Sequence, residues 1–157
     1  MSHLHGVYEV AIRVKDLSRA EAFYCTLLGL EIGLRDEKRR RLYLRVGGRS
    51  GMLILQEDRG TWSTQHFALR GDVSDFEQAA SVLRTNGIVV QGPLLLPWMP
   101  ARSIYFANPD GHDLELCSPL TACSLRDHRQ PPIQLGPRLQ AGGMRIILTP
   151  SWVRGTR

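Results

Sequence analysis

Acidic or imidazole side chains interrupt the apolar pattern of three predicted strands at Glu9, His66 and Glu115. In each strand the residue two positions further on is a small Ala or Cys. Because side chains two apart share one face of a strand, each ligand-type group would lie beside a neighbour that leaves room for an ion and its waters. Carboxylate and imidazole groups are common ligands of divalent metals. The pattern therefore predicts one metal site on one face of a sheet.

Each of these residues has an ordinary alternative when taken singly. A lone His on a strand is more often a hydrogen-bonded structural residue, and either Glu could simply face solvent. An internal repeat favours the metal interpretation, because EVAIR at 9–13 aligns with HFALR at 66–70. Glu9 and His66 then occupy equivalent positions in two similar units.

Two successive units with the same order of elements account for residues 7–118. Alternating apolar residues predict a strand from Glu9 to Val14, and helical spacing predicts a helix that Gly29 ends. The remaining elements predicted for the first unit are the helix Ser18–Leu28 and the strands Glu31–Arg35, Arg41–Val46 and Met52–Gln56. Those of the second unit are the strands Gln65–Arg70, Ile88–Val90, Ser103–Ala107 and Asp113–Cys117, with a helix at Ser74–Asn86.

This order predicts the α+β class, with two βαβββ modules that pair into a cupped mixed sheet and carry their helices on the outside. Residues 1–118 are expected to form a single domain, with module one at 7–57 and module two at 63–118. Residues 119–157 form a basic, Pro- and Gly-rich tail. The tail is expected to be partly disordered or packed along the body, with a strand plausible only at 144–148.

The excess of positive charge lies entirely in this tail. Residues 1–118 carry 14 Lys and Arg against 14 Asp and Glu, whereas residues 119–157 carry six Arg against one Asp. Phosphate binding needs clustered positive charge on the folded surface, so the balanced body argues against a nucleic-acid partner. The tail is instead a candidate for contact with a partner subunit.

The chain is expected to be a cytoplasmic protein that does not enter membranes. Its first residues lack a basic segment followed by an apolar run, and no stretch is long and apolar enough for a membrane span. The three cysteines, Cys25, Cys117 and Cys123, form no CxxC pair, which favours reduced thiols over a disulfide framework or a zinc site. Cys25 and Cys117 are interpreted as small buried hydrophobic residues.

Three segments, VAIRVKDLSRAEAFYCTLLGLEIG, QHFALRG and SIYFANPDGHDLELCSP, carry a resemblance to a known family. The first is similar to the opening βα unit, and the other two to the second half, of the vicinal oxygen chelate superfamily. This superfamily includes glyoxalase I, extradiol dioxygenases, fosfomycin-resistance enzymes and bleomycin-binding proteins. The last segment is the more specific, because NPDG makes the tight turn that leads into the strand of Glu115. The resemblance covers about residues 7–118.

The resemblance implies that metal ligands come from the first strand of each module and the last strand of the second, at Glu9, His66 and Glu115. Most metal-binding members have His in the place of Glu9, so Glu there implies either a site with two carboxylates and one His or a member without metal. A fourth ligand position falls on the strand Met52–Gln56. Aligning Gly51 with Gly111 puts Leu55 there, and a shift of one residue makes Gln56 the ligand.

Oxygen-rich ligation with one imidazole suits Mn²⁺, Fe²⁺ or Mg²⁺, and leaves Zn²⁺ and Ni²⁺ open. Two carboxylates weaken the Lewis acidity of the ion and disfavour oxygen activation. The shared device of the family is then expected, in which one divalent metal ion binds neighbouring substrate oxygens and stabilises developing negative charge. Glu9 and Tyr105 are the candidates for direct catalytic roles.

Further residues are candidates for contact with the small-molecule substrate. By resemblance to the fosfomycin-resistance branch, Tyr105 and Ser103 would touch it, although aromatic strand residues are usually core. Trp98 and Trp62 could form a rim over the cup, and Arg102 could hold an anionic group. The rim tryptophans have the alternative role of shaping loops.

Three functions remain open from the sequence. The first is a metal-dependent lyase, isomerase or transferase acting on a small molecule with neighbouring oxygens. The second is a metal-free protein that binds a small molecule, such as an antibiotic, in the same cup. A structural role for the basic tail on a metal-free fold is a third. Members of the superfamily commonly dimerise, sometimes exchanging halves, so a homodimer is expected.

Overall fold

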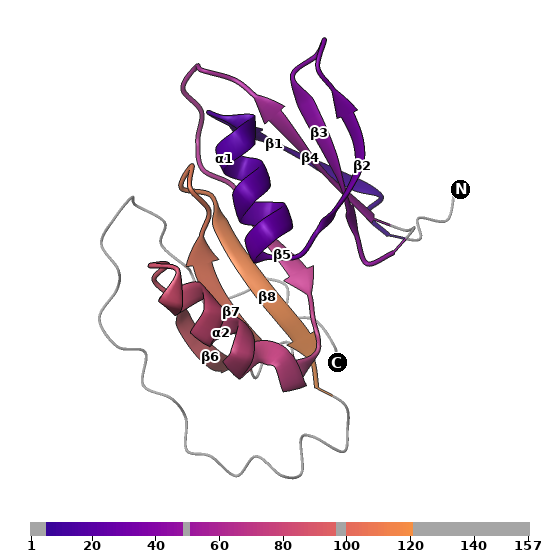
Figure 1. The fold of residues 1–157 in the computed structure, drawn as a ribbon. Coiled ribbons are helices and arrows are strands. Elements are labelled where there is room, and N and C mark those ends of the chain that lie inside the picture. The colour runs from indigo at the N-terminus through magenta and orange to yellow at the C-terminus, as the bar shows by residue number, and fades with distance from the viewer. Residues whose placement is uncertain (1–5, 49–50, 97–99, 121–157) are drawn as a thin grey trace, which may run out of the picture.

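A computed structural model describes residues 6–48, 51–96 and 100–120 of the chain. These residues form two modules that follow one another in the sequence and contact each other along one side (Figure 1). Module one contains the elements β1 (Glu9–Val14), α1 (Leu17–Glu21), η1 (Ala22–Leu27), β2 (Glu31–Asp36), β3 (Arg41–Val46) and β4 (Gly51–Glu57). Module two contains β5 (His66–Arg70), η2 (Val73–Asp75), α2 (Phe76–Thr85), β6 (Gln91–Leu96), β7 (Ala101–Ala107) and β8 (Asp113–Pro119).

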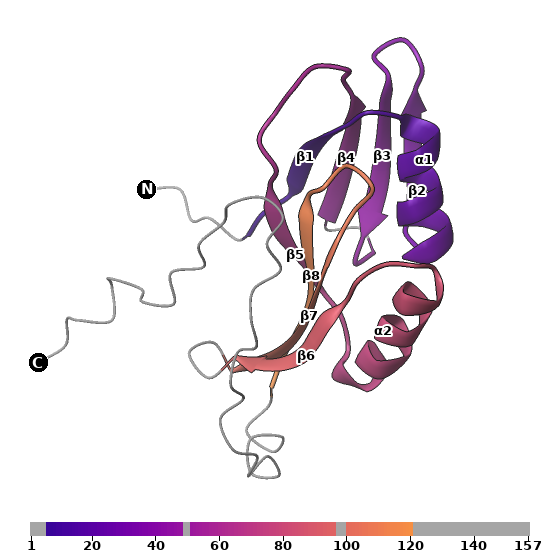
Figure 2. The same cartoon turned by 90° about the vertical axis from the view of Figure 1, so that its left-hand side faces the viewer.

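Each module holds one four-stranded mixed sheet, with the order β1-β4-β3-β2 in module one and β5-β8-β7-β6 in module two. The first and last strands of each module pair in parallel, and the other pairs are antiparallel. The helices of both modules lie on the same side of the sheets (Figure 2). The predicted α+β class with two βαβββ modules is therefore confirmed.

The apolar pattern of each strand divides a helix-covered face from an open face. In β1, Ile12 and Val14 are buried under the helix of module one, whereas Ala11 and Arg13 are exposed on the other face. In β8 the fully buried Leu114 lies on the helix-covered face. Polar residues at alternate positions therefore project from the open face, which is where the candidate ligands lie.

The helix of module one begins at Leu17, one residue before the predicted Ser18, and then changes its geometry. The side chain of Asp16 accepts a hydrogen bond from the backbone N–H of Arg19, which caps the first turn. After Glu21 the helix continues with π-type geometry to Leu27, and Gly29 follows with a φ of 74°. This positive φ explains why Gly ends the helix.

The strand predicted at Ile88–Val90 is wrong, because the observed strand β6 begins at Gln91. The run of β-branched residues suggested a strand, but Val89 is exposed and unpaired. The pairing of β6 with β7 instead shifts register between Gln91 and Leu94. Gly92 permits this shift, since a Cβ there would lie 2.7 Å from the carbonyl oxygen of Ser103.

The turn before β8 joins the two modules through three polar side chains, Asn108, Asp110 and His112. The amide of Asn108 donates to the Tyr24 hydroxyl at 3.0 Å, and Asp110 accepts from the guanidinium of Arg19 at 2.6 Å. His112, which is fully buried, has its Nε2 2.7 Å from the carbonyl oxygen of Arg13. We call residues 108–112 the strap.

Internal hydrogen bonds hold the strap in shape. The side-chain oxygen of Asn108 accepts from the backbone N–H groups of Asp110 and His112. The Nδ1 atom of His112 accepts from the backbone N–H of Gln65 at 3.0 Å, so the proton of the neutral ring lies on Nε2 and is donated to Arg13. His112 thereby ties the start of β5, the start of β8 and the end of β1 together.

None of the described helices is long and apolar enough to cross a membrane. The tail from residue 121 onward, including the strand predicted at 144–148, lies outside the described residues.

We predict that Asn108→Ala destabilises the protein by about 2–3 kcal/mol, because it removes the bond to Tyr24 and leaves two backbone N–H groups without their acceptor. Urea unfolding measures the loss. Asn86→Ala is the matched control, since Asn86 is exposed and is expected to cost less than about 1 kcal/mol. Equal losses of stability in the two variants would show that the hydrogen bonds of Asn108 stabilise the protein no more than those of an exposed asparagine.

Candidate functional site

The open face of module two brings His66 and Glu115 together. The two residues lie on the parallel strands β5 and β8, where Glu115 is the register partner of Ala68, two residues after His66. Nε2 of His66 is 3.3 Å from Oε2 of Glu115. The imidazole is 35% exposed and the carboxylate only 7%, so the pair has a buried and an accessible end. The small side chain of Ala68 leaves space beside it.

The neighbouring strand β7 adds Ser103 and Tyr105 to the same face. Ser103 is fully buried, and its hydroxyl donates to Oε1 of Glu115 at 2.5 Å. Tyr105 is the register partner of Glu115, and its ring stacks against that of His66 with centroids 6.3 Å apart. The structure thus gathers three of the predicted site residues, His66, Ser103 and Tyr105, around the carboxylate of a fourth, Glu115.

The environment of this cluster keeps its weaker acids protonated. Burial, and then the nearby charge of Glu115, raise the pKa of Tyr105 to about 12. Burial also raises the pKa of the Cys117 thiol. At neutral pH the Tyr105 hydroxyl is therefore a hydrogen-bond donor, and Cys117 is a neutral thiol, as expected for a small hydrophobic residue.

Glu9 does not join this cluster within one chain. It is exposed on the open face of module one, where its register partner on β4 is Met52. Among the described residues, no three His, Cys, Asp or Glu side chains lie close enough to hold one metal ion. The imidazole of His66 and the carboxylate of Glu115 would suit two adjacent positions around a divalent ion, and a third protein ligand would have to come from outside this pair.

The register of module one places Ile54 at the position equivalent to Glu115. Glu115 pairs with Ala68 in module two, and Ile54 pairs with the equivalent Ala11 in module one. Neither alignment made from the sequence identified this residue, because the pairing register cannot be read from glycine spacing. Leu55 is fully buried, and Gln56 lies on the open face as the partner of Arg13. Gln56 stays a predicted ligand, but it lies two residues beyond the equivalent position.

Gln56 and Trp62 line a separate cavity of about 440 Å³ at the end of β1 and β4. The ammonium group of Lys15 lies 5.1 Å from the centre of the Trp62 ring, which fixes one face of the indole. Ser63 and Gln65 from the segment between the modules complete a polar wall. Trp62 is therefore placed at a hollow, as a rim residue would be.

The two remaining predicted contacts are not part of this arrangement. Arg102 lies on the opposite face of β7 from Ser103, and its guanidinium is 3.9 Å from the carboxylate of Glu77 on α2. Trp98 lies outside the described residues.

His112 is the residue near the site that the sequence interpretation missed. It lies three residues before Glu115, and the backbone group that it accepts from, Gln65, immediately precedes His66. The only signal in the sequence was its position directly after the NPDG turn. In His112, Nδ1 accepts from Gln65 and Nε2 donates to Arg13. These partners are distant in the sequence, so no local pattern predicts the arrangement.

Comparisons with known proteins agree with this architecture. The family model described as Glyoxalase/Bleomycin resistance protein/Dioxygenase superfamily matches residues 6–116. The metallothiol transferase FosB of Staphylococcus saprophyticus is 28% identical over 119 residues, which cover 72% of this chain and 76% of that protein.

Two solved structures are similar over about three quarters of this chain. The integron cassette protein HFX_CASS4, from the mobile metagenome of a Halifax Harbour sewage outfall, is 43% identical with a TM-score of 0.69, over 73% of this chain and 99% of that one. TnmS3, an antibiotic binding protein from Streptomyces sp. CB03234, is 24% identical with a TM-score of 0.64, over 76% and 100% of the two chains. The latter likeness is one of fold.

We predict that Tyr105 ionises near pH 12 rather than near its ordinary pKa of 10.0. A difference titration of phenolate absorbance between the wild type and Tyr105→Phe isolates this group. Because the folded-state pKa is the higher one, the associated stability is complete below pH 10 and is lost as the pH rises toward 12. Glu115→Gln should lower the midpoint, since it removes the neighbouring negative charge. A midpoint near 10 in the wild type would contradict the described environment.

Proposed function

Because the chain belongs to the glyoxalase/bleomycin resistance protein/dioxygenase superfamily, we propose that it is a divalent-metal-dependent lyase, isomerase or transferase. Its substrate is a small molecule with neighbouring oxygen atoms. The observation that carries the proposal is the approach of His66 Nε2 to Glu115 Oε2 at 3.3 Å on the open face. An imidazole and a carboxylate at this distance, with an accessible side, suit adjacent positions around one Mn²⁺, Fe²⁺, Mg²⁺, Ni²⁺ or Zn²⁺ ion.

A divalent ion held by His66 and Glu115 would supply Lewis-acid stabilisation of negative charge on a substrate oxygen. Ser103 orients Glu115 by donating to its Oε1, so Oε2 is the oxygen that would be available as a ligand. The Tyr105 hydroxyl keeps its proton at neutral pH and donates a hydrogen bond to a substrate oxygen. Within the three reaction classes, the curated relatives favour the transferase, since they are named metallothiol transferases.

We place the third ligand, Glu9, in a homodimer. Glu9 is exposed on the open face of module one, and it is not near His66 and Glu115 of the same chain. The open face also exposes Leu34, 57% accessible, at the register position beside Tyr43. A second copy whose module one covers this module two would bury that surface and bring its Glu9 to the ion. Trp62, at its hollow, then forms part of the rim.

A metal-free binding protein is the second candidate, and one observation favours it. The carboxylate of Glu115 already accepts from Ser103 and approaches His66, so its buried oxygens have partners without an ion. In that case the open faces bind a flat small molecule and catalyse no reaction. The two candidates differ in whether a stoichiometric ion is bound.

We predict that the purified protein binds one divalent ion per chain, measured by elemental analysis and by calorimetric titration with Mn²⁺. His66→Ala and Glu115→Gln should each weaken the affinity by at least about 100-fold, because each removes a ligand. Asp72→Asn is the control, since this exposed carboxylate follows β5 and lies outside the cluster. If no metal is bound and the melting temperature does not change on adding Mn²⁺, Ni²⁺ or Zn²⁺, the proposal of a metal-dependent enzyme is refuted. The metal-free binding protein is then the remaining candidate.

The position of Glu9 has a separate test in mixed dimers. Glu9→Gln and His66→Ala should each lose the site alone, yet unfolding and refolding them together should restore about a quarter of the metal sites, because half the dimers are mixed and each has one intact site. Light scattering verifies the dimer. No recovery would place Glu9 outside the site or in the same chain as His66.

A further inference from the structure

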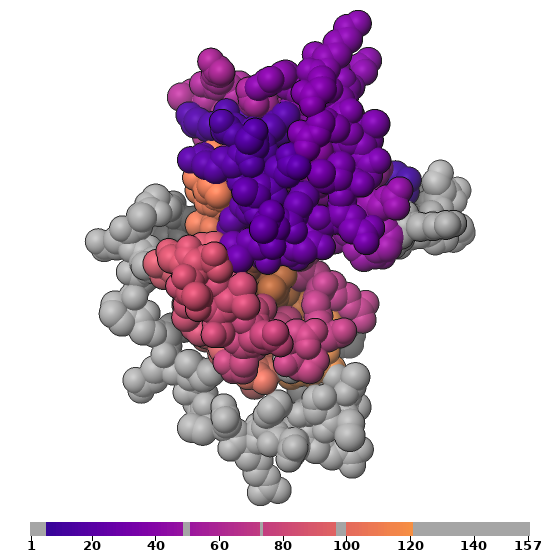
Figure 3. All heavy atoms as spheres, in the orientation of Figure 1, coloured from indigo at the N-terminus to yellow at the C-terminus, as the bar shows by residue number. Residues whose placement is uncertain are grey.

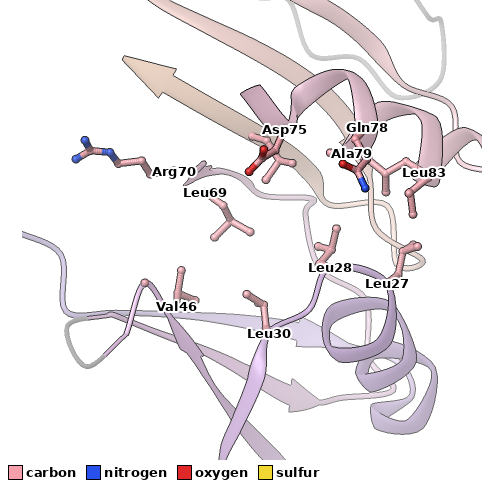
Figure 4. Close-up of a pocket in the computed structure, with 13 residues that line it drawn as sticks. Leu27, Leu28, Leu30, Val46, Leu69, Arg70, Asp75, Gln78, Ala79 and Leu83 are labelled. Carbon is pink, nitrogen blue, oxygen red and sulfur yellow. The ribbon is translucent and has the colours of Figure 1, made fainter. Parts of the chain in front are cut away.

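A second cavity, of about 470 Å³, lies between the modules on the side that carries the helices. This volume is within the range of small-molecule sites, about 300–1,000 Å³. Figure 3 shows the boundary between the modules from this side, and Figure 4 shows the cavity itself. The cavity lies on the opposite face of β8 from the candidate site, because Leu116 lines it and the adjacent Glu115 faces the open side.

The walls of the cavity are mostly apolar and come from both modules. Module one contributes Leu27, Leu28 and Leu30 from the end of its helix and the segment after it, together with Val46. Module two contributes apolar side chains of β5, α2 and β8, which are Leu69, Ala79, Val82, Leu83 and Leu116. Val82 is 41% exposed, so water contacts an apolar wall that a ligand would cover.

The polar groups at the cavity differ in where they point. Asp75 and Gln78 direct their side chains toward the cavity from the start of α2, whereas the guanidinium of Arg70 extends away from it (Figure 4). The carboxylate of Asp75 makes no hydrogen bond to the backbone of its own helix, and accepts only from the Ser74 hydroxyl at 3.0 Å among the described contacts. The cavity therefore offers one carboxylate and one amide above an apolar floor.

From this arrangement we propose that the cavity is a second ligand site, for a small apolar molecule that carries one cationic amino group. The apolar body fills the space between Leu28 and Leu69, and the ammonium group pairs with Asp75 and donates to the Gln78 amide oxygen. Charge complementarity selects the amine over the corresponding acid, because a carboxylate in this position would face Asp75. The site does not depend on metal binding at His66 and Glu115.

The test uses two probes of equal length and opposite charge, 4-phenylbutylamine and 4-phenylbutanoate, with the full chain labelled at its Leu and Val methyl groups. The amine is expected to shift the methyl resonances of the cavity residues and to bind more tightly than the acid. Asp75→Asn should weaken the amine about threefold to fivefold, as expected for a partly exposed ion pair, and leave the acid unaffected or improved. Asp72→Asn, the same change on an exposed residue outside the cavity, should have no effect.

A filling variant provides an independent check. Ala79→Leu places a larger side chain in the cavity and should abolish binding of the amine, with a cooperative melting transition showing that the variant folds. The proposal is overturned if the acid binds as well as the amine, if Asp75→Asn and Asp72→Asn behave alike, or if the methyl groups that shift lie on the open face. Loss of metal binding in His66→Ala with retained amine binding separates this site from the proposed enzyme site.

Discussion

The strap at 108–112 is the constraint on which the relative placement of the modules depends. Its side chains are buried polar groups, and each finds its partner in the other module: Asn108 at Tyr24, Asp110 at Arg19 and His112 at Arg13. Such groups cost free energy when they lose their partners, so the arrangement is held by the penalty for separation as much as by the bonds themselves. Since His112 also accepts from the backbone of Gln65, the same ring holds the residue that immediately precedes β5 and His66. The geometry of His66 and Glu115 therefore rests on a residue that touches neither.

Because side chains alternate along β8, the strand has a polar face toward the candidate site and an apolar face toward the cavity between the modules. Glu115 faces the open side, where Ser103 and Tyr105 surround it, and Leu116 faces the cavity between the modules. Neighbouring residues on a strand point to opposite faces, so a single register fixes both environments at once. The predicted fold followed from this same period of two, which is why the strands were found with small errors. The strand β6 was misplaced because its pairing depends on a register shift at Gly92, and β-branched residues just before it imitated a strand.

The candidate site could be predicted from the sequence only where its partners were local or repeated. His66 and Glu115 were found because ligand-type residues stood at strand positions beside small neighbours, and the structure brings them together. The pattern could not predict whether Glu9 joins them. Alternation along a strand shows which face a side chain occupies, but it does not show which module packs against that face. The predicted substrate contact of Arg102 did not take strand alternation into account. Arg102 is adjacent to Ser103 on β7, so its side chain points to the opposite face, where its guanidinium lies beside Glu77 on the helix side. The role of His112 depends on two strands distant in sequence, so no local signal displayed it.

The two modules share a fold but differ in the potential ligands at equivalent positions. Module two has a potential ligand at both equivalent positions, His66 and Glu115, whereas module one has Glu9 and the apolar Ile54. Isoleucine cannot coordinate an ion, so module one alone lacks the adjacent pair that module two presents on its parallel strands. In the proposed dimer, the His66 and Glu115 pair of module two would supply two adjacent ligands, and Glu9 of the other copy would add one further carboxylate. Two carboxylates and one imidazole would neutralise a divalent charge, which favours stabilising an oxyanion by position over strong polarisation of a carbonyl. The chemistry of the proposed enzyme would thus depend on the apolar Ile54 in module one as well as on the His66 and Glu115 pair in module two.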